Sequence, residues 1–412
     1  MPREPDTLST STTGKDALIA KLHDRTAKIG IIGLGYVGLP LMLRFSEVGY
    51  PVVGFDIDDK KVSRLNAGES YIERITAETI QKAVKRGFKA TTDFSKCVEV
   101  DALIICVPTP LSKYREPDLS FVIDTVEAMV PHLRKGQVVS LESTTYPGTT
   151  EEELRPRIEA RGFEIGSDVF LVFSPEREDP SNPDYETKTI PKVCGGSTPA
   201  CLEAGLALYG QAIQKVVPVS STQAAEMTKL LENIHRAVNI GLANEMKVIC
   251  DKMDIDVYEV IRAAATKPFG FHPFYPGPGW GGQCIPVDPA YLSWRVRQMG
   301  STAHFVELAR EINDRMPVYV TQRINDLLNE SGQSMRGSKI LILGVTYKAD
   351  IDDTRESPAN ELINRLLKKG AAVSFNDPYV ERLTVGDTTL ERTELTKENL
   401  ESADVVVVIT AH

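Results

Sequence analysis

The chain has 412 residues, 42% hydrophobic and 25% charged, which is typical of a globular protein with two or three domains. Its formal net charge of −10 disfavours nucleic acid and anionic membranes as partners. We find no apolar run long enough to span a membrane and no hydrophobic signal core. The six cysteines lack the paired spacing of zinc sites or disulfide frameworks, so we expect no metal and a cytoplasmic location.

The first motif joins an apolar run at 28–32 to a turn that reads Gly-Leu-Gly-Tyr-Val-Gly at 33–38, and a helical pattern then begins. In such a strand–turn–helix unit the first glycine makes the turn, the second admits a pyrophosphate, and the third lets helix pack on strand. A second predicted strand, 51–55, ends at Asp56. An acid at this spacing binds ribose hydroxyls and repels a 2′-phosphate, so the motif predicts NAD rather than NADP.

Three further predicted strands end in polar residues. The strand 102–107 ends in Pro-Thr-Pro, the strand 137–141 in Glu-Ser-Thr, and the strand 169–173 in Ser-Pro-Glu. Turn formation explains any one of these clusters equally well. Because open α/β sheets bind ligands at the carboxyl ends of their parallel strands, three clusters together favour a site along one sheet edge.

From Ser221 to about Cys250 the pattern predicts one long helix. Glu226, Lys229 and Asn233 are three and four residues apart and therefore share a face, which continues with apolar residues. A solvated charge pair is the commoner interpretation of such spacing. A lysine among apolar residues is also a candidate for stabilising an oxyanion. The other faces of so long a helix must be buried, which makes a subunit interface plausible.

The stretch 276–288 reads Pro-Gly-Pro-Gly-Trp-Gly-Gly-Gln-Cys-Ile-Pro-Val-Asp and holds Cys284 among four glycines and three prolines. Glycine allows close backbone approach and proline stiffens a loop. A buried, inert thiol is the commoner fate of a lone cysteine. This loop composition instead favours a shaped loop that presents Cys284, with a carboxylate at Asp288.

A second strand–helix–strand pattern covers 339–344, 359–369 and 372–375 and ends at Asp377, which predicts a weak internal duplication. Its first turn has a single glycine and is therefore not a dinucleotide motif. Lys348 and Arg355 follow its first strand and suit a different phosphate-bearing ligand.

Together these motifs resemble the UDP-glucose/GDP-mannose dehydrogenase family over about residues 28–412. The resemblance rests on Gly-Leu-Gly-Tyr-Val-Gly-Leu-Pro (33–40), Val-Pro-Thr-Pro (107–110), Ser-Thr (143–144), Ser-Pro-Glu (174–176), Lys229 with Asn233, Gly-Gly-Gln-Cys (281–284) with Asp288, and Lys348 with Asp-Thr-Arg-Glu-Ser-Pro (353–358). The segments 174–180, 228–240 and 265–271 look most like the family members that oxidise UDP-N-acetylglucosamine.

The resemblance implies an α/β fold with two Rossmann-like doubly wound domains, joined by a long central helix and an all-helical middle domain. We expect a disordered tail and lead-in at 1–25, an NAD-binding domain at 26–219, a central helical domain with the cysteine loop at 220–335, and a UDP-sugar-binding domain at 336–412. A homodimer through the central helix is also expected.

The implied reaction is a four-electron oxidation of the C6 hydroxymethyl of a UDP-sugar, with two NAD⁺ reduced, for surface-polysaccharide precursor synthesis. Cys284 would form a hemithioacetal and then a thioester, Lys229 would stabilise oxyanions, and Asn233 and Asp288 would orient water. The implied catalytic residues are Cys284, Lys229, Asn233, Asp288, Glu176 and Thr144. The implied cofactor-binding residues are Gly33, Gly35, Tyr36, Val37, Gly38, Asp56, Lys61, Pro108, Thr109, Thr144 and Arg355. The implied substrate-binding residues are Glu176, Lys229, Asn233, Lys267, Tyr275, Gly277, Gly279, Gly281 and Lys348.

Several alternatives stay open at this point. The sugar is UDP-N-acetylglucosamine by resemblance, with UDP-glucose and UDP-N-acetylmannosamine as alternatives. A two-electron dehydrogenase and a non-catalytic protein that binds NAD or a nucleotide sugar are the rival functions. Pro180 stands where members acting on UDP-glucose commonly carry a second glutamate, and Glu178 has no assigned role. The family pattern continues past His412, so we expect a longer natural gene product.

Overall fold

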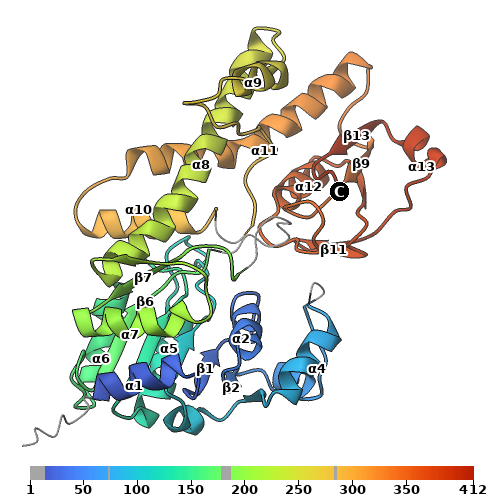
Figure 1. Ribbon diagram of the computed structural model, residues 1–412. Helices are drawn as coiled ribbons and strands as arrows, with labels where there is room; N and C mark the ends of the chain where they lie inside the picture. Colours follow the sequence, from blue (N-terminus) through green and yellow to red (C-terminus); the bar gives the residue numbers. More distant parts are fainter. Residues whose placement is uncertain (1–13, 73–74, 178–186, 283–284) are drawn as a thin grey trace, which may run out of the picture. The chain divides into compact units, whose positions relative to one another are not determined.

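The computed structural model describes residues 14–72, 75–177, 187–282 and 285–412 (Figure 1). The chain forms two compact units, Met1–Leu230 and Leu231–His412. The boundary between them falls inside the helix α8 (Thr222–Lys252), which confirms the single long helix that the sequence predicts there. The first unit has a largely parallel sheet and the second a smaller parallel sheet, and each unit has a hydrophobic core of its own.

The first unit is built around one sheet, whose eight strands in the described part of the chain lie in the order β3-β2-β1-β4-β5-β6-β7-β8. The strands are β1 (Ile29–Ile32), β2 (Val52–Phe55), β3 (Lys89–Thr91), β4 (Ala102–Ile105), β5 (Gln137–Leu141), β6 (Val169–Phe173), β7 (Lys192–Gly196) and β8 (Val216–Val219). Strands β1 to β6 run parallel, β7 runs antiparallel to β6, and β8 runs parallel to β7. The polar clusters after β4, β5 and β6 therefore share one sheet edge, as predicted.

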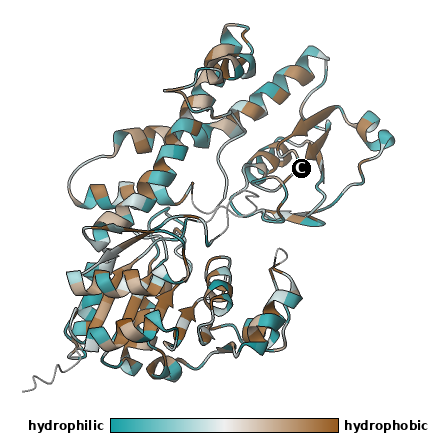
Figure 2. Ribbon diagram, viewed as in Figure 1, coloured by the Kyte–Doolittle hydropathy of each residue, from teal (hydrophilic) through white to brown (hydrophobic). Residues whose placement is uncertain are grey.

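The strands of this sheet are apolar on both faces because helices cover both sides of a largely parallel sheet. Every residue of β1, β2, β4, β5 and β6 is buried, and these strands form the brown, hydrophobic layer in Figure 2. The helices of the unit are α1 (Gly14–His23), α2 (Gly38–Glu47), α3 (Asp59–Asn66), α4 (Ala77–Lys85), α5 (Ser120–Met129), α6 (Arg155–Glu159) and α7 (Pro199–Gly210). Helix α7 packs on β6 and β7, and α1 packs on α7.

The second unit combines helices with a smaller sheet. Its helices after α8 are α9 (Val257–Ala265), α10 (Asp288–Gln298), α11 (His304–Glu330), α12 (Pro358–Lys368) and α13 (Lys397–Ser402). Its strands are β9 (Lys339–Leu343), β10 (Ala372–Asn376), β11 (Arg382–Val385), β12 (Thr388–Glu391) and β13 (Val405–Val408). A parallel sheet has the order β10-β9-β13, and β11 and β12 pair as an antiparallel hairpin.

The two units repeat one local geometry, which supports the internal duplication inferred from the sequence. In the first unit, the backbone N–H of Leu34 donates to Oδ2 of Asp56 at 2.9 Å. In the second unit, the N–H of Val345 donates to Oδ2 of Asp377 at 2.7 Å. In each case an acid after the second strand fixes the turn after the first.

Some elements differ from the sequence-based expectation. The sequence between the strands 102–107 and 137–141 predicts a helix over about 119–133, whereas α5 ends at Met129 and a 3₁₀ turn covers Val130–His132. The physical reason is Pro131, which lacks the N–H that would continue the α-helical hydrogen-bond pattern beyond Val130. The strands β3, β7 and β8 and the β11–β12 hairpin were not predicted, because they are short and lack clear alternation.

No helix in the described ranges has the length and apolar character needed to cross a membrane. Within the same ranges, no group of three or more His, Cys, Asp or Glu side chains is arranged to hold a metal ion.

Candidate active site

The three glycines of the first turn have different surroundings. Gly33 has a φ of +87°, and a Cβ built on it would lie 2.7 Å from the carbonyl oxygen of Cys106. A Cβ on Gly38 would lie 1.9 Å from the carbonyl oxygen of Gly33. A Cβ on Gly35 would meet no described heavy atom within 4 Å. Gly33 and Gly38 are therefore required by protein packing, whereas Gly35 borders open space into which a pyrophosphate fits.

The N-terminus of α2 suits a phosphate group. Val37 occupies the N-cap position, and no side-chain cap is found there among the described residues. The first turn of α2 carries no acidic residue. Its N–H groups and the positive end of the helix dipole therefore suit an anion. Tyr36, in the same turn, is partly exposed, with 41% of its surface accessible.

Asp56 lies at the end of β2 in a fixed orientation. One carboxylate oxygen accepts from Leu34 N–H at 2.9 Å, and the other accepts from Asp58 N–H at 3.0 Å. The Lys61 ammonium lies 3.7 Å from Oδ2 of Asp56. Each carboxylate oxygen can accept a second hydrogen bond, so both retain capacity for ribose hydroxyls. These residues fit an NAD adenosine ribose.

Tyr71 supports this turn and was not predicted from the sequence. Its hydroxyl donates to the carbonyl oxygen of Leu34. Burial raises the pKa of Tyr71, with the charge of Asp56 adding to the effect, so the hydroxyl stays protonated as a donor. The cations of Lys61 and Arg64 each lie 5.9 Å from the Tyr71 ring centroid. No motif connects Tyr71 with the glycine turn, so the sequence gives no signal for it.

We expect Asp56 to determine the choice of cofactor. The wild-type chain should prefer NAD⁺ over NADP⁺ by about 100-fold in kcat/KM, since repulsion of a 2′-phosphate near a buried carboxylate is worth about 3 kcal/mol. Asp56→Ala should remove most of this preference. Asp58→Ala is the matched control, because that carboxylate caps α3 through Lys60 N–H at 2.9 Å. Equal wild-type kcat/KM for both cofactors would show that Asp56 does not bind the ribose.

The loops after β4 and β5 are linked at the sheet edge. The Ser143 hydroxyl donates to the carbonyl oxygen of Val107 at 2.7 Å. Thr144, the next residue, is half-buried, as is Thr109 after β4, whereas Pro108 is exposed. The predicted cofactor-binding residues of these loops therefore follow two strands that are neighbours in the sheet.

A buried charge network lies beside Glu176 at the same edge. The ammonium of Lys192, at the start of β7, lies 2.7 Å from Oε2 of Glu142 and 3.6 Å from Oε2 of Glu176. It also donates to the carbonyl oxygen of Pro175 at 3.2 Å. The Tyr209 hydroxyl donates to Oε1 of Glu142 at 2.7 Å. Sequence reasoning predicted Glu176 and noted Glu142 as a polar strand end, but it missed Lys192 and Tyr209.

The first turns of α8 are fixed to the loop after β5. The buried Glu226 carboxylate accepts from Gly148 N–H at 2.5 Å, from Thr150 N–H at 2.9 Å and from the Thr150 hydroxyl at 2.7 Å. Burial raises the pKa of Glu226. Lys229 follows one turn later and is also buried. Glu226 therefore fixes the rotation of the helix that carries Lys229.

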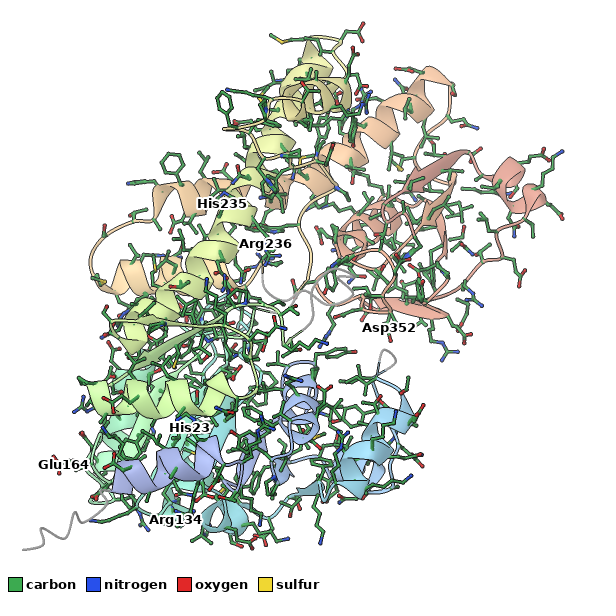
Figure 3. The ribbon with its side chains drawn as sticks, in the orientation of Figure 1. His23, Arg134, Glu164, His235, Arg236 and Asp352 are labelled. Carbon is green, nitrogen blue, oxygen red and sulfur yellow. The ribbon has the colours of Figure 1, made fainter. Side chains whose placement is uncertain are left out.

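In the second unit, the structure brings Asn233 and Asp288 together. The side-chain N–H of Asn233 donates to Oδ2 of Asp288, and the side-chain oxygen Oδ1 of Asn233 accepts from the Arg236 guanidinium. Both Asn233 and Asp288 are almost fully buried. Arg236 and its neighbour His235 lie on α8, as Figure 3 shows. These contacts fix the amide so that its N–H groups face the carboxylate.

The glycine-rich loop is fixed on the side that precedes Cys284. Gly277 N–H donates to Oδ1 of Asn244 at 2.9 Å. A Cβ on Gly281 would lie 2.8 Å from Cβ of Tyr347, and a Cβ on Gly282 would lie 2.8 Å from the Tyr347 ring. Only glycine therefore fits at the two positions against Tyr347. Cys284 itself lies outside the described residues, as does Gln283.

The remaining predicted residues have local partners in the second unit. The Lys267 ammonium lies 5.2 Å from the Phe269 ring centroid, and the Tyr275 ring stacks on Tyr258 with centroids 6.5 Å apart. The Arg355 guanidinium binds both carboxylate oxygens of Asp353, at 2.8 and 2.7 Å. Gly279 has a φ of +139°, and the backbone carbonyl oxygen of Lys348 accepts from the Thr346 hydroxyl at 2.9 Å. The ligand-binding roles of these residues stay predictions.

Comparison with known proteins identifies the family. The chain matches three parts of the UDP-glucose/GDP-mannose dehydrogenase family: the NAD binding domain at residues 27–213, the central domain at 223–315 and the UDP binding domain at 341–412. It is 35% identical over 389 residues to UDP-N-acetyl-D-mannosamine dehydrogenase of Methanococcus maripaludis, covering 93% of this chain and 86% of that relative. It is 37% identical over 357 residues to UDP-N-acetyl-D-glucosamine 6-dehydrogenase of Salmonella typhi, covering 86% and 83%.

A solved structure gives the same result. UDP-D-ManNAc dehydrogenase from Pyrococcus horikoshii matches with a TM-score of 0.86 and 31% identity, covering 93% of this chain and 89% of that chain. These findings confirm the α/β fold and the family inferred from the sequence motifs. The chain therefore belongs to the UDP-glucose/GDP-mannose dehydrogenase family and is an NAD-dependent UDP-sugar oxidoreductase.

Proposed function

We propose that the chain oxidises the C6 hydroxymethyl group of UDP-N-acetylglucosamine to the carboxylate, in the cytoplasm, for surface-polysaccharide precursor synthesis. One alcohol, two NAD⁺ and one water give one carboxylate, two NADH and three protons. The NAD binding and UDP binding domains support this pairing of ligands. The free thiols of Cys97, Cys106, Cys194, Cys201 and Cys250 support a reducing compartment.

The steps assign one task to each side chain. NAD⁺, when bound, accepts a hydride at each of the two oxidations. After the first, the Cys284 thiolate bonds to the aldehyde carbon, and the Lys229 ammonium stabilises the oxyanion. Loss of the second hydride leaves a thioester on Cys284. Water held by Asn233 and Asp288 then adds to its carbonyl, the carbon–sulfur bond breaks, and the thiolate returns.

The observation that carries this proposal is the anchoring of the loop around Cys284 on both sides. Before the cysteine, Gly281 and Gly282 pack against Tyr347 so closely that no side chain fits. After it, Asp288 is held by Asn233. Such pre-organisation is what a covalent nucleophile requires, because a displacement of about 1 Å can cost about 100-fold in rate. A merely structural cysteine has no such requirement.

The identity of the sugar rests on segment resemblance. Relatives with the names UDP-N-acetyl-D-glucosamine 6-dehydrogenase and UDP-N-acetyl-D-mannosamine dehydrogenase match at 37% and 35% identity, so both N-acetylated sugars are candidates. The segments 174–180, 228–240 and 265–271 favour the gluco sugar. UDP-glucose is the third candidate.

A panel of UDP-sugars with NAD⁺ tests both the sugar and the electron count. We expect the highest kcat/KM with UDP-N-acetylglucosamine and a yield of two NADH per sugar consumed. A preference for UDP-glucose or UDP-N-acetylmannosamine would replace the sugar assignment and keep the mechanism. One NADH per sugar would instead indicate a two-electron dehydrogenase. Binding of both ligands without any NADH would indicate a non-catalytic protein.

We also infer that two copies of the chain associate through α8. Leu242, Met246 and Ile249 of α8 are spaced by four and three residues, so they form one stripe. Their exposed fractions are 55, 37 and 40%, which is unusual for a run of large apolar side chains. Sedimentation should show a species of twice the 45.4-kDa chain mass, and a Leu242→Glu/Ile249→Glu variant should be monomeric. A monomeric wild type would contradict this inference.

A further inference from the structure

The direction of β7 determines where Lys192 lies. Strand β7 runs antiparallel to β6, with Phe173 paired to Gly195 and Val172 paired to Gly196. The Ser174 hydroxyl, just beyond β6, donates to the carbonyl oxygen of Val193 at 2.7 Å and extends this register. Lys192, the first residue of β7, therefore lies at the edge where β4, β5 and β6 end. A parallel β7 would have placed it at the opposite edge, away from Glu176.

Lys192 is held on one side and faces Glu176 on the other. On the buried side, the Glu142 side chain is 0% exposed and binds the ammonium at 2.7 Å. The second oxygen of Glu142 accepts from Tyr209, whose hydroxyl also lies 2.8 Å from the Ser140 hydroxyl. On the outer side, the Glu176 side chain is 14% exposed and lies 3.6 Å from the ammonium. A continuous chain of contacts thus connects Tyr209 in the core with Glu176, the predicted site residue.

An ordinary buried ion pair does not account for this arrangement. Lys192 and Glu142 alone would form a neutral pair, and no second acid would be needed. Two carboxylates share one ammonium, so the ammonium is the cation that offsets the repulsion between them. Other charged or titratable groups close to the network are Cys106 just after β4, Cys194 in β7 and Arg177. The Arg177 backbone N–H donates to Oε1 of Glu176 at 2.7 Å, and its guanidinium donates to the carbonyl oxygen of Pro191 at 2.6 Å.

We propose that Lys192 is a positioning residue for Glu176: its ammonium holds the Glu176 carboxylate ionised and in place at the end of β6, and Glu142 and Tyr209 hold Lys192. This rests on the proposed function and on the contact between Glu176 and the UDP-sugar that the family resemblance implies.

The pKa directions agree with this arrangement. Burial raises the pKa of Glu142 to about 6. Burial alone would lower the pKa of Lys192, but the charges of Glu142 and Glu176 outweigh it, so the ammonium stays charged. Removing the ammonium takes away a cation that favours the ionised form of Glu176 and therefore raises its pKa. Activity that needs an ionised Glu176 is lost as pH falls. Without the ammonium, the acidic limb of the pH profile of kcat/KM must therefore move to higher pH.

The test compares Lys192→Met, Glu142→Gln and the double variant with the wild type. We expect Lys192→Met to move the acidic limb of kcat/KM upward by about one pH unit and to lower kcat/KM by about tenfold near neutral pH. The double variant should move the limb in the same direction by a smaller amount, because it also removes the Glu142 charge, and it avoids leaving a buried charge unpaired if the single variant folds poorly. Glu142→Gln should leave the acidic limb at the same pH or move it to lower pH, because it removes a negative charge close to Glu176. NAD⁺ affinity should stay within about twofold throughout.

A purely structural network gives a different pattern. Both single substitutions would then reduce the amount of folded enzyme, and both would have the same effect on the acidic limb. An acidic limb in the double variant that coincides with the wild type would overturn the proposal. So would an upward shift in Glu142→Gln equal to that in Lys192→Met.

A second readout separates this proposal from the proposed function. In protein labelled with ¹³C at glutamate carboxyls, the Glu176 resonance is the one missing in Glu176→Gln. Its titration should move to higher pH in Lys192→Met, whether or not the enzyme turns over a UDP-sugar. If the wild type oxidises no UDP-sugar, the proposed function fails. If Glu176 titrates at the same pH with and without Lys192, the positioning role fails.

Discussion

Replacing Cys284 with alanine is expected to abolish net oxidation of the UDP-sugar and to leave NAD⁺ binding unchanged. Without the thiolate no hemithioacetal forms, so the aldehyde has no covalent route to the second hydride transfer. Loss of a nucleophile of this kind lowers kcat by at least about 10³-fold. NADH formation measures the turnover, and fluorescence quenching by the cofactor measures its affinity.

Cys250→Ala is the matched control for this experiment, because Cys250 is a free cysteine buried in the same unit. It should cost stability but keep kcat within about twofold, since the thiol packs in a small apolar cluster with Val257 and Ile261. Cys284→Ser should accumulate a slowly hydrolysed ester, because a hydroxyl is a poorer nucleophile and a poorer leaving group than a thiol. Full turnover by the Cys284→Ala variant is the outcome that contradicts covalent catalysis.

Alanine substitutions at Gly38 and Gly35 are expected to separate folding from cofactor binding. A Cβ on Gly38 would lie 1.9 Å from the Gly33 carbonyl oxygen, a distance that no rotamer relieves. Gly38→Ala should therefore destabilise the first unit by about 3 kcal/mol or more and abolish NAD⁺ binding. A Cβ on Gly35 meets no described atom within 4 Å, so Gly35→Ala should fold normally and lose about 100-fold in NAD⁺ affinity.

Thermal unfolding and NAD⁺ titration together check this pair. The Gly35→Ala variant should have an unfolding temperature within about 2 °C of the wild type, which shows that its defect is in binding. Two results would be inconsistent with the expected geometry. One is normal NAD⁺ affinity in Gly35→Ala, and the other is a stable Gly38→Ala variant.

The sequence predicted the longest and most apolar elements of the fold. The runs at 29–32, 102–105 and 169–173 are strands because each is apolar throughout, and α8 is one helix because no proline interrupts it. Strand direction carries no such signal. Nothing in the residues of β7 or β8 indicates that they run opposite to β6, because direction depends on how the connecting chain returns.

The site was predicted only where a motif marks it. Asp56 follows the glycine turn at a recognisable spacing, and the structure places it against that turn. Lys192 and Tyr209 have no motif, and they are 50 and 67 residues from Glu142 in the chain. Their contacts exist because β7 runs back along β6 and α7 packs against β5 and β6. A periodicity analysis cannot detect pairs that tertiary structure alone brings together.

The continuity of α8 limits modular exchange between members of the family. A junction before Thr222 would leave the N–H groups of Gly148 and Thr150 without the Glu226 carboxylate. A junction at Leu231 would cut the helix and expose the free N–H groups of a new first turn.

A chimera that combines this cofactor-binding half with another sugar-binding half should therefore be joined after Lys252. The transplanted counterpart of α11 would then have to fit Gly241, where an added Cβ would already lie 3.3 Å from Cα of Ala309. Family members with a side chain larger than alanine at the position of Ala309 would be unsuitable donors of the sugar-binding half.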